Sequence, residues 1–172
     1  MWAAGLSWDS PLPEDLRDEW LNYRSKLGVL TKIRIGRWLG MVPHAPTTLH
    51  GFCDASSHAY AAVIYTGTAD ADGTVRFSLL TARTKVAPLN GATIPRLGLS
   101  AALLLAETLR NVREALSLVE APYFLLSDSA IVLCWLKKQH TTLKPFVSNR
   151  VRRIQELTSA SRPLSNEPCR LC

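Results

Sequence analysis

The sequence predicts an α/β domain in which a mixed β-sheet packs against helices. Three apolar runs rich in β-branched residues lie between residues 48 and 87, and short turns join them, which indicates an antiparallel meander. A helical run, a fourth strand-like run and two more helical runs follow. Hydrophobic residues make up 47% of the chain and charged residues 20%, proportions that are typical of a domain with a buried core.

The N-terminal part predicts a helix over residues 10–28. Ser10 is a plausible N-cap, acidic residues fill the first turn, and Gly28 is placed to end the helix. Its apolar residues recur on one helical face: Leu16, Trp20, Tyr23 and Leu27. Residues 31–43 are apolar and basic, so we expect residues 1–45 to form a connector with one amphipathic helix.

The meander begins at Thr48 with TLHGFCDAS and continues through AYAAVIYTGT and VRFSLLTARTKVA. Asp72-Gly73, between the second and third runs, is a strong signal for a hairpin turn. We therefore expect three sequential antiparallel strands.

The second half predicts a helix over Leu97–Leu116, a strand in APYFLLSDS and a helix in SAIVLCWLKKQ that Ser127 or Ser129 caps. The last helix, KPFVSNRVRRIQEL, is expected to turn its apolar residues inward and its arginines outward. Residues 159–172 show no periodicity and predict a loose tail, which leaves residues 46–158 as the folded domain.

Two aspartates stand where strands are expected to end. Asp54 and Asp128 each follow an apolar run, and carboxylates from adjacent strands can converge at one end of a sheet. Close carboxylates repel each other, and a divalent cation such as Mg²⁺ relieves that repulsion. An aspartate at a strand end is also an ordinary turn former or helix N-cap, so the pattern alone leaves both interpretations open.

A formal net charge of +6 favours a polyanionic partner, with nucleic acid first. Basic residues gather on the last two predicted helices: Lys137, Lys138, Lys144, Arg150, Arg152 and Arg153. They predict a stripe that contacts phosphates, with a solvated helix face as the alternative.

The four cysteines give little sign of a metal site or disulfide. Cys53 and Cys134 lie in apolar runs and are expected in the core, whereas Cys169 and Cys172 form a CxxC without a second pair. The chain shows no signal peptide and no apolar run of about 18 residues, so we expect an intracellular protein that does not enter a membrane.

Several runs resemble the polyprotein of BEL/Pao-type long-terminal-repeat retrotransposons, in a region often labelled Pao retrotransposon peptidase. They are collinear over residues 5–157: GFCDAS, AYAAVIY, ARTKVAPL, IPRL, ALLLAETL, LLSDSAIVLCWLK and KPFVSNRVRRIQEL. The resemblance implies a ribonuclease H-like domain, with an antiparallel meander plus one parallel strand in its sheet. It also implies RNA–DNA hybrid as substrate, Mg²⁺ or Mn²⁺ as cofactor and the reverse transcriptase region of the same polyprotein as neighbour.

The family pattern makes Asp54 and Asp128 catalytic metal ligands. It places the catalytic glutamate in IPRLEL, whereas this chain reads IPRLGL, so Gly98 occupies that position. The fourth carboxylate of the pattern lies in a run like NPAD, and no aspartate follows Asp128 here. Glu107 lies half a helical turn from position 98, and nothing around Glu167 supports it as a substitute. We therefore expect a weakly bound cation and impaired cleavage, which leaves open whether the chain is an enzyme.

Two alternatives remain. The chain is either a non-enzymatic nucleic-acid-binding or scaffold remnant of a retroelement polyprotein, or a pseudogene product without a partner. Hybrid affinity that falls with salt but is unaffected by Asp54→Asn distinguishes the first, and the second predicts no specific binding.

Overall fold

The computed structural model describes all residues except 1–4, 8, 42–45, 71, 90 and 159–172. The chain divides into two compact units, residues 1–36 and residues 37–172. The boundaries expected at residues 45 and 158 remain predictions, and the expected C-terminal tail lies outside the described residues. Among the described residues, no helix has the length and apolar character that crossing a membrane requires.

The first unit contains helix α1 (Glu14–Lys26) and the 3₁₀-helix η2 (Leu27–Lys32). The expected start and end of the helix were wrong. Pro13, which cannot cap through its side chain, precedes α1 in place of Ser10, and Gly28 lies inside η2 instead of ending the helix. None of the α1 residues is buried.

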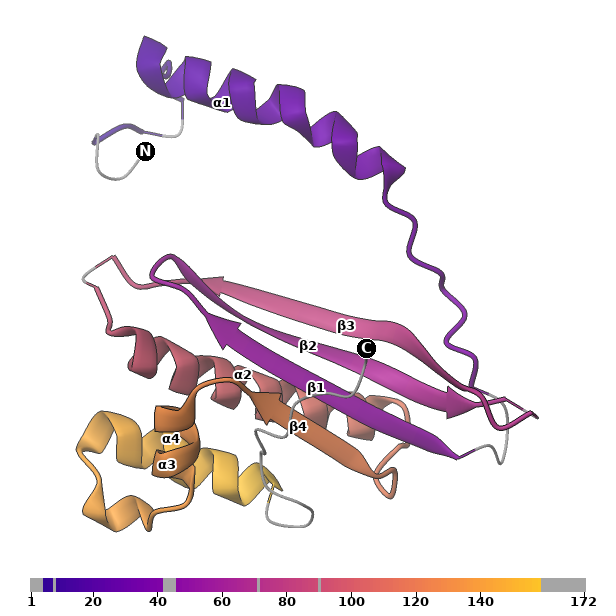
Figure 1. Cartoon of the computed structure of the whole chain (residues 1–172). Coiled ribbons are helices and arrows are strands. Elements are labelled where there is room, and N and C mark those ends of the chain that lie inside the picture. Colours follow the sequence, from indigo (N-terminus) through magenta and orange to yellow (C-terminus); the bar gives the residue numbers. More distant parts are fainter. Residues whose placement is uncertain (1–4, 8, 42–45, 71, 90, 159–172) are drawn as a thin grey trace. The chain divides into compact units, whose positions relative to one another are not determined.

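The second unit is built on a four-stranded sheet in the order β3-β2-β1-β4. The antiparallel meander consists of β1 (Thr47–Ala55), β2 (Ala59–Ala69) and β3 (Val75–Val86), as expected. The edge strand β4 (Tyr123–Ser127) pairs with β1 in parallel. This confirms the mixed sheet of meander plus parallel strand (Figure 1).

One face of the sheet packs against α2 (Ile94–Ala115), which buries ten of its residues. Gly51 of β1 allows this close approach. A Cβ atom there would lie 2.7 Å from Leu105 Cδ1 of α2 and 2.8 Å from Leu125 Cδ2 of β4, so any side chain would collide with the core. The sheet and α2 therefore share one close-packed apolar layer.

Three short helical elements complete the unit: α3 (Ala130–Leu136), η3 (His140–Thr142) and α4 (Pro145–Thr158). Ser129 caps α3, since its hydroxyl accepts the amide of Val132, which settles the two expected alternatives in its favour. Helix α4 packs beside α2 and buries Val147, Val151 and Ile154 as the amphipathic pattern predicted (Figure 1).

The other face of the sheet carries an aromatic row. The His50 ring stacks on Phe124 with centroids 5.2 Å apart and meets the edge of Phe77 at 4.9 Å. Burial lowers the pKa of His50, so this ring is neutral near pH 7. The two faces therefore differ, with aliphatic packing on one and half-exposed aromatic contacts on the other.

Candidate functional site

The parallel pairing of β1 with β4 brings Asp54 and Asp128 to the same end of the sheet. Cys53 is the partner of Ser127 in the register, and each aspartate is the next residue of its chain. Both aspartates are exposed, whereas Cys53 and Ser127 are buried. We call the edge formed by Asp54, Asp128 and the facing position Gly98 the carboxylate edge.

The environment of Cys53 is consistent with this proximity. Burial raises the pKa of its thiol to about 11, a hydrogen bond with Ser127 opposes that rise, and the charges of Asp128 and Asp54 add to it. The two aspartates, each next in the chain to one residue of the Cys53–Ser127 register pair, flank this buried thiol in sequence. One carboxylate oxygen of Asp54 also accepts the amide of Ala55 at 2.6 Å.

Gly98 lies in the second turn of α2 and faces the junction of β4 and α3. A Cβ atom at this position would lie 3.3 Å from Val132 Cγ2 and 3.8 Å from both Cβ and Oγ of Ser129. Because Ser129 directly follows Asp128, a longer side chain at position 98 would begin beside the carboxylate edge. The position at which the family resemblance expects a glutamate is thus a glycine that faces the junction between β4 and α3.

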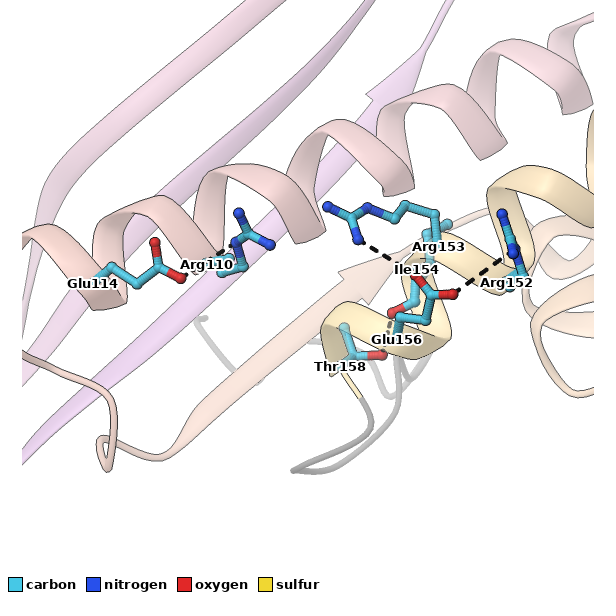
Figure 2. A network of polar contacts seen from close by, with 7 residues as sticks. All are labelled: Arg110, Glu114, Arg152, Arg153, Ile154, Glu156 and Thr158. Atoms are coloured by element: carbon cyan, nitrogen blue, oxygen red, sulfur yellow. Dashed lines mark hydrogen bonds and ion pairs between the residues drawn. The ribbon is translucent and has the colours of Figure 1, made fainter.

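Other carboxylates in the described part of the chain do not replace it. Glu156 of α4 lies within ion-pair distance of Arg152 at 3.8 Å and Arg153 at 3.3 Å (Figure 2). Glu107 lies on α2 half a turn from position 98, as expected from the helical period, and Glu167 lies outside the described residues.

Among the described residues, the edge offers two carboxylates, which is a small donor set for a divalent cation. Mg²⁺ requires near-octahedral oxygen coordination, and a pair of ions requires carboxylates that bridge them. The described residues contain no group of three or more His, Cys, Asp or Glu side chains arranged to hold a metal ion. Asp54 and Asp128 alone remain for this role, and it stays a prediction.

The predicted basic stripe is divided in the structure. Lys137 and Lys138 are exposed just after α3, and Lys144 is exposed just before α4. Arg152 and Arg153 are exposed on α4, but both are within ion-pair distance of Glu156 (Figure 2). Glu156 therefore balances part of the positive charge of these two arginines, and the six basic residues do not form one uniform surface.

Arg150 does not point simply outward, as the amphipathic pattern had suggested. Its guanidinium carbon lies 3.6 Å from the centroid of the Phe146 ring, and its Nε donates to Ser100 Oγ of α2 at 3.3 Å. Arg96 of α2 lies over the same ring at 5.1 Å, and no pattern in the sequence pointed to this residue. We call Arg96 and Arg150 the arginine pair.

One cysteine that was expected in the core is placed differently. Cys134 is exposed, because it lies on the outer side of the short helix α3, and its assignment to the core was wrong. Trp135 is half-buried and lines a cleft of about 880 Å³ together with Arg96, Lys144 and Val147. Cys53 is buried as expected.

Comparison with solved structures returns ribonucleases H at low identity. The N-terminal RNase H domain of a Mycobacterium tuberculosis protein is 17% identical, with 70% of this chain and 79% of that chain covered and a TM-score of 0.46. RNase H1 of Halobacterium salinarum is 16% identical, with 71% and 86% covered and a TM-score of 0.41. Prototype foamy virus protease–reverse transcriptase is 14% identical, with 77% and 20% covered and a TM-score of 0.48.

The comparison in sequence is more specific. No protein among those with curated functions matches the chain significantly. The model of the family described as Pao retrotransposon-like RNaseH-like domain matches residues 1–129, a stretch that includes Asp54, Gly98 and Asp128. The chain therefore belongs to the family of Pao retrotransposon-like, RNase H-like domains.

Proposed function

We propose that this domain binds RNA–DNA hybrid and that its capacity to cut the RNA strand is impaired. The family is retrotransposon-like and RNase H-like, and the resemblance implies RNA–DNA hybrid as the substrate. The reverse transcriptase region of the same polyprotein is the natural neighbour of the domain under this proposal. The folded part responsible for it comprises residues 46–158.

The observation that carries the impairment is the placement of Gly98. It faces Ser129 and Val132 at the β4–α3 junction and brings no side-chain oxygen to the carboxylate edge. A divalent cation at this edge would have Asp54 and Asp128 as its protein ligands and would supply charge stabilisation to a phosphodiester. With two carboxylates in place of a larger set, we expect weak binding of Mg²⁺ or Mn²⁺ and poor positioning of the scissile phosphate.

Support for binding comes from the positive charge of lysines that are exposed at the surface. The chain has a net charge of +6, and Lys137, Lys138 and Lys144 are exposed on or beside the elements that follow β4. Phosphate contacts of this kind act over a whole surface and do not need the precise geometry that cleavage needs. Loss of carboxylates from the edge is therefore compatible with retained affinity for hybrid.

The test is a paired measurement on the full chain with a fluorescently labelled RNA–DNA hybrid. Anisotropy gives the affinity and its salt dependence, and gel analysis after incubation with Mg²⁺ or Mn²⁺ gives cleavage. We expect affinity that falls steeply with salt, and little cleavage. Cutting that is robust in the wild type and abolished by Asp54→Asn would overturn the impairment.

The same variant separates a damaged nuclease from a purely binding module. If a cation at the edge contributes to hybrid binding, Asp54→Asn lowers the affinity measured in Mg²⁺ but leaves the affinity in EDTA unchanged. Equal affinities of wild type and Asp54→Asn in both buffers would favour the non-enzymatic alternative. Absence of salt-dependent hybrid binding would contradict the proposal as a whole.

A further inference from the structure

Helix α1 carries an unburied apolar stripe at the spacing of a coiled-coil seam. The stripe consists of Leu16, Trp20, Tyr23 and the C-cap residue Leu27, which follow one another at steps of four, three and four residues. At about 100° per residue, these positions fall within about 60° of one helical face. Trp20 is 49% exposed and Tyr23 is 57% exposed. We call these four residues the α1 stripe.

Two aromatic side chains form the centre of the α1 stripe. The rings of Trp20 and Tyr23 lie with their centroids 5.8 Å apart, so they form one continuous apolar surface. Tryptophan and tyrosine are enriched among the residues that dominate binding at protein interfaces. A seam of alternating three- and four-residue steps fits the same seam on a second helix, so a helix is the partner that this spacing favours.

The charges beside the α1 stripe favour a second copy of the same helix in parallel orientation. With Leu16 and Tyr23 at the d positions of a heptad, Glu19 occupies a g position and Arg24 an e position, and both are exposed. In a parallel pair, the g residue of one helix faces the e residue that lies five positions later on the other. Glu19 of each copy would therefore face Arg24 of the other copy, and the two-fold axis repeats this attraction on both sides of the seam.

An antiparallel pair of the same helices is less favourable. In that orientation the e positions face each other, so Arg17 would face Arg24 of the second copy. This repulsion opposes the attraction between Glu19 and Lys26, which occupy facing g positions. The parallel pair has the attraction without a like-charge contact, because Lys26 there would face the uncharged Thr31.

We propose that the chain dimerises by parallel pairing of α1 with α1 of a second copy. This inference goes beyond the proposed function, because it concerns contact between two copies of the protein in the absence of nucleic acid. The α1 stripe spans about two heptads, which is short for a coiled coil. We therefore expect a weak dimer with a Kd on the order of 100 µM.

Sedimentation equilibrium of the full chain between about 5 and 500 µM, on both sides of that Kd, tests the proposal. Trp20→Ala is expected to weaken dimerisation more than about tenfold, because it removes the largest side chain of the stripe. The matched control is Leu21→Ala, at a side chain that is 43% exposed but lies about 100° from its neighbour Trp20 and off the stripe. It is expected to stay within about twofold of the wild type, and alanine preserves the helix at both positions.

Two results of this experiment would refute the dimer. A chain that stays monomeric at every concentration would assign the α1 stripe to a partner other than a second copy. A dimer that Trp20→Ala and Leu21→Ala affect equally would show that the chain associates through another surface.

Charge variants test the orientation of the pair. Arg24→Glu places like charges at both contacts with Glu19 and is expected to weaken a parallel dimer on the order of fivefold. An antiparallel dimer would instead become tighter, because the new carboxylate would face Arg17. The double variant Glu19→Arg/Arg24→Glu exchanges the two charges and is expected to return the Kd to within about twofold of the wild type. Tighter association of Arg24→Glu, or no recovery in the double variant, would contradict parallel pairing.

Discussion

The carboxylate edge and the exposed lysines that follow β4 tolerate sequence change very differently. Gly98 brings no side-chain oxygen to the edge, whereas Lys137 and Lys138 are exposed just after α3. Cleavage needs a complete set of oxygen ligands in fixed positions, so one glycine removes a required part. Phosphate binding needs only net positive charge at roughly the right place, and that charge is present. Under the proposed function, the domain would therefore lose cleavage and keep its affinity for hybrid.

The largest expected effect is a gain of RNA-strand cleavage when a carboxylate is introduced at position 98. In Gly98→Glu the new carboxylate starts beside the β4–α3 junction, where Val132 must shift by a few tenths of an ångström. We expect hybrid cleavage in Mn²⁺ to rise on the order of a hundredfold over the wild type, since a metal ligand contributes several kcal/mol to the transition state. The initial rate of RNA-strand cutting measures it.

Gly98→Gln is the matched control, because it has the same length and steric demand but no charge. It is expected to stay at the wild-type rate. Equal cutting by the Glu and Gln variants would show that volume, and not the carboxylate, was missing at position 98. No gain in either variant would mean that the edge lacks more than this one ligand.

The pH dependence of stability probes the burial beneath the carboxylate edge. Burial raises the pKa of Cys53 from 9.0 to about 11, so below pH 9 both the folded and the unfolded chain hold the proton and stability is full. Between pH 9 and pH 11 the unfolded chain loses the proton first, and the free energy of unfolding is expected to fall by about 2 kcal/mol. Urea unfolding at pH 8.5 and pH 10.5 measures this fall, and Cys53→Ala should lack it. An identical fall in both proteins would assign it to other groups.

The arginine pair also predicts a difference in stability between two arginines on one helix. Arg150→Ala loses the ring contact and the hydrogen bond to Ser100, for which we expect about 1–2 kcal/mol. Arg152→Ala breaks an exposed ion pair with Glu156 and is expected to cost about 0.5 kcal/mol or less. Chemical denaturation of both variants checks the order. Equal costs would show that the ring contact adds nothing.

The smallest expected effect concerns the tolerance of position 98 itself. In Gly98→Ala the higher helix propensity of alanine, about 1 kcal/mol, is opposed by the close contact with Val132, so we expect a net change below about 1 kcal/mol. Thermal unfolding measures it. A loss well above that value would mean that the glycine is required for packing, which would undermine the use of Gly98→Glu as a restoring variant.

Much of the fold could be predicted from the sequence, because local residue patterns identify its strands and helices. The strands alternate or run apolar between Gly- and Asp-containing turns, and Ser129 caps α3 as a helix-start residue should. Helix α1 was placed less well, since Ser10 looked like a cap although Pro13 precedes the helix. Since α1 has no buried residue, burial does not fix where it begins and ends.

The sites were predictable to the extent that they are short motifs. The runs around Asp54, Gly98 and Asp128 carry the family resemblance, and the parallel register then places them at one edge. The arginine pair could not be found this way, because Arg96 and Arg150 meet only through tertiary packing of α2 on α4. Counting basic residues along α4 also gave no sign that Glu156 neighbours two of them.

The order of the strands has a consequence for how the protein is made. Strand β4 pairs with β1, but it is synthesised only after β2, β3 and α2. Asp54 at the end of β1 is therefore made well before Asp128, which follows β4. Such long-range parallel pairing is slow compared with hairpin formation. A nascent chain that stops before Tyr123 can form the meander but still has β1 unpaired on one side.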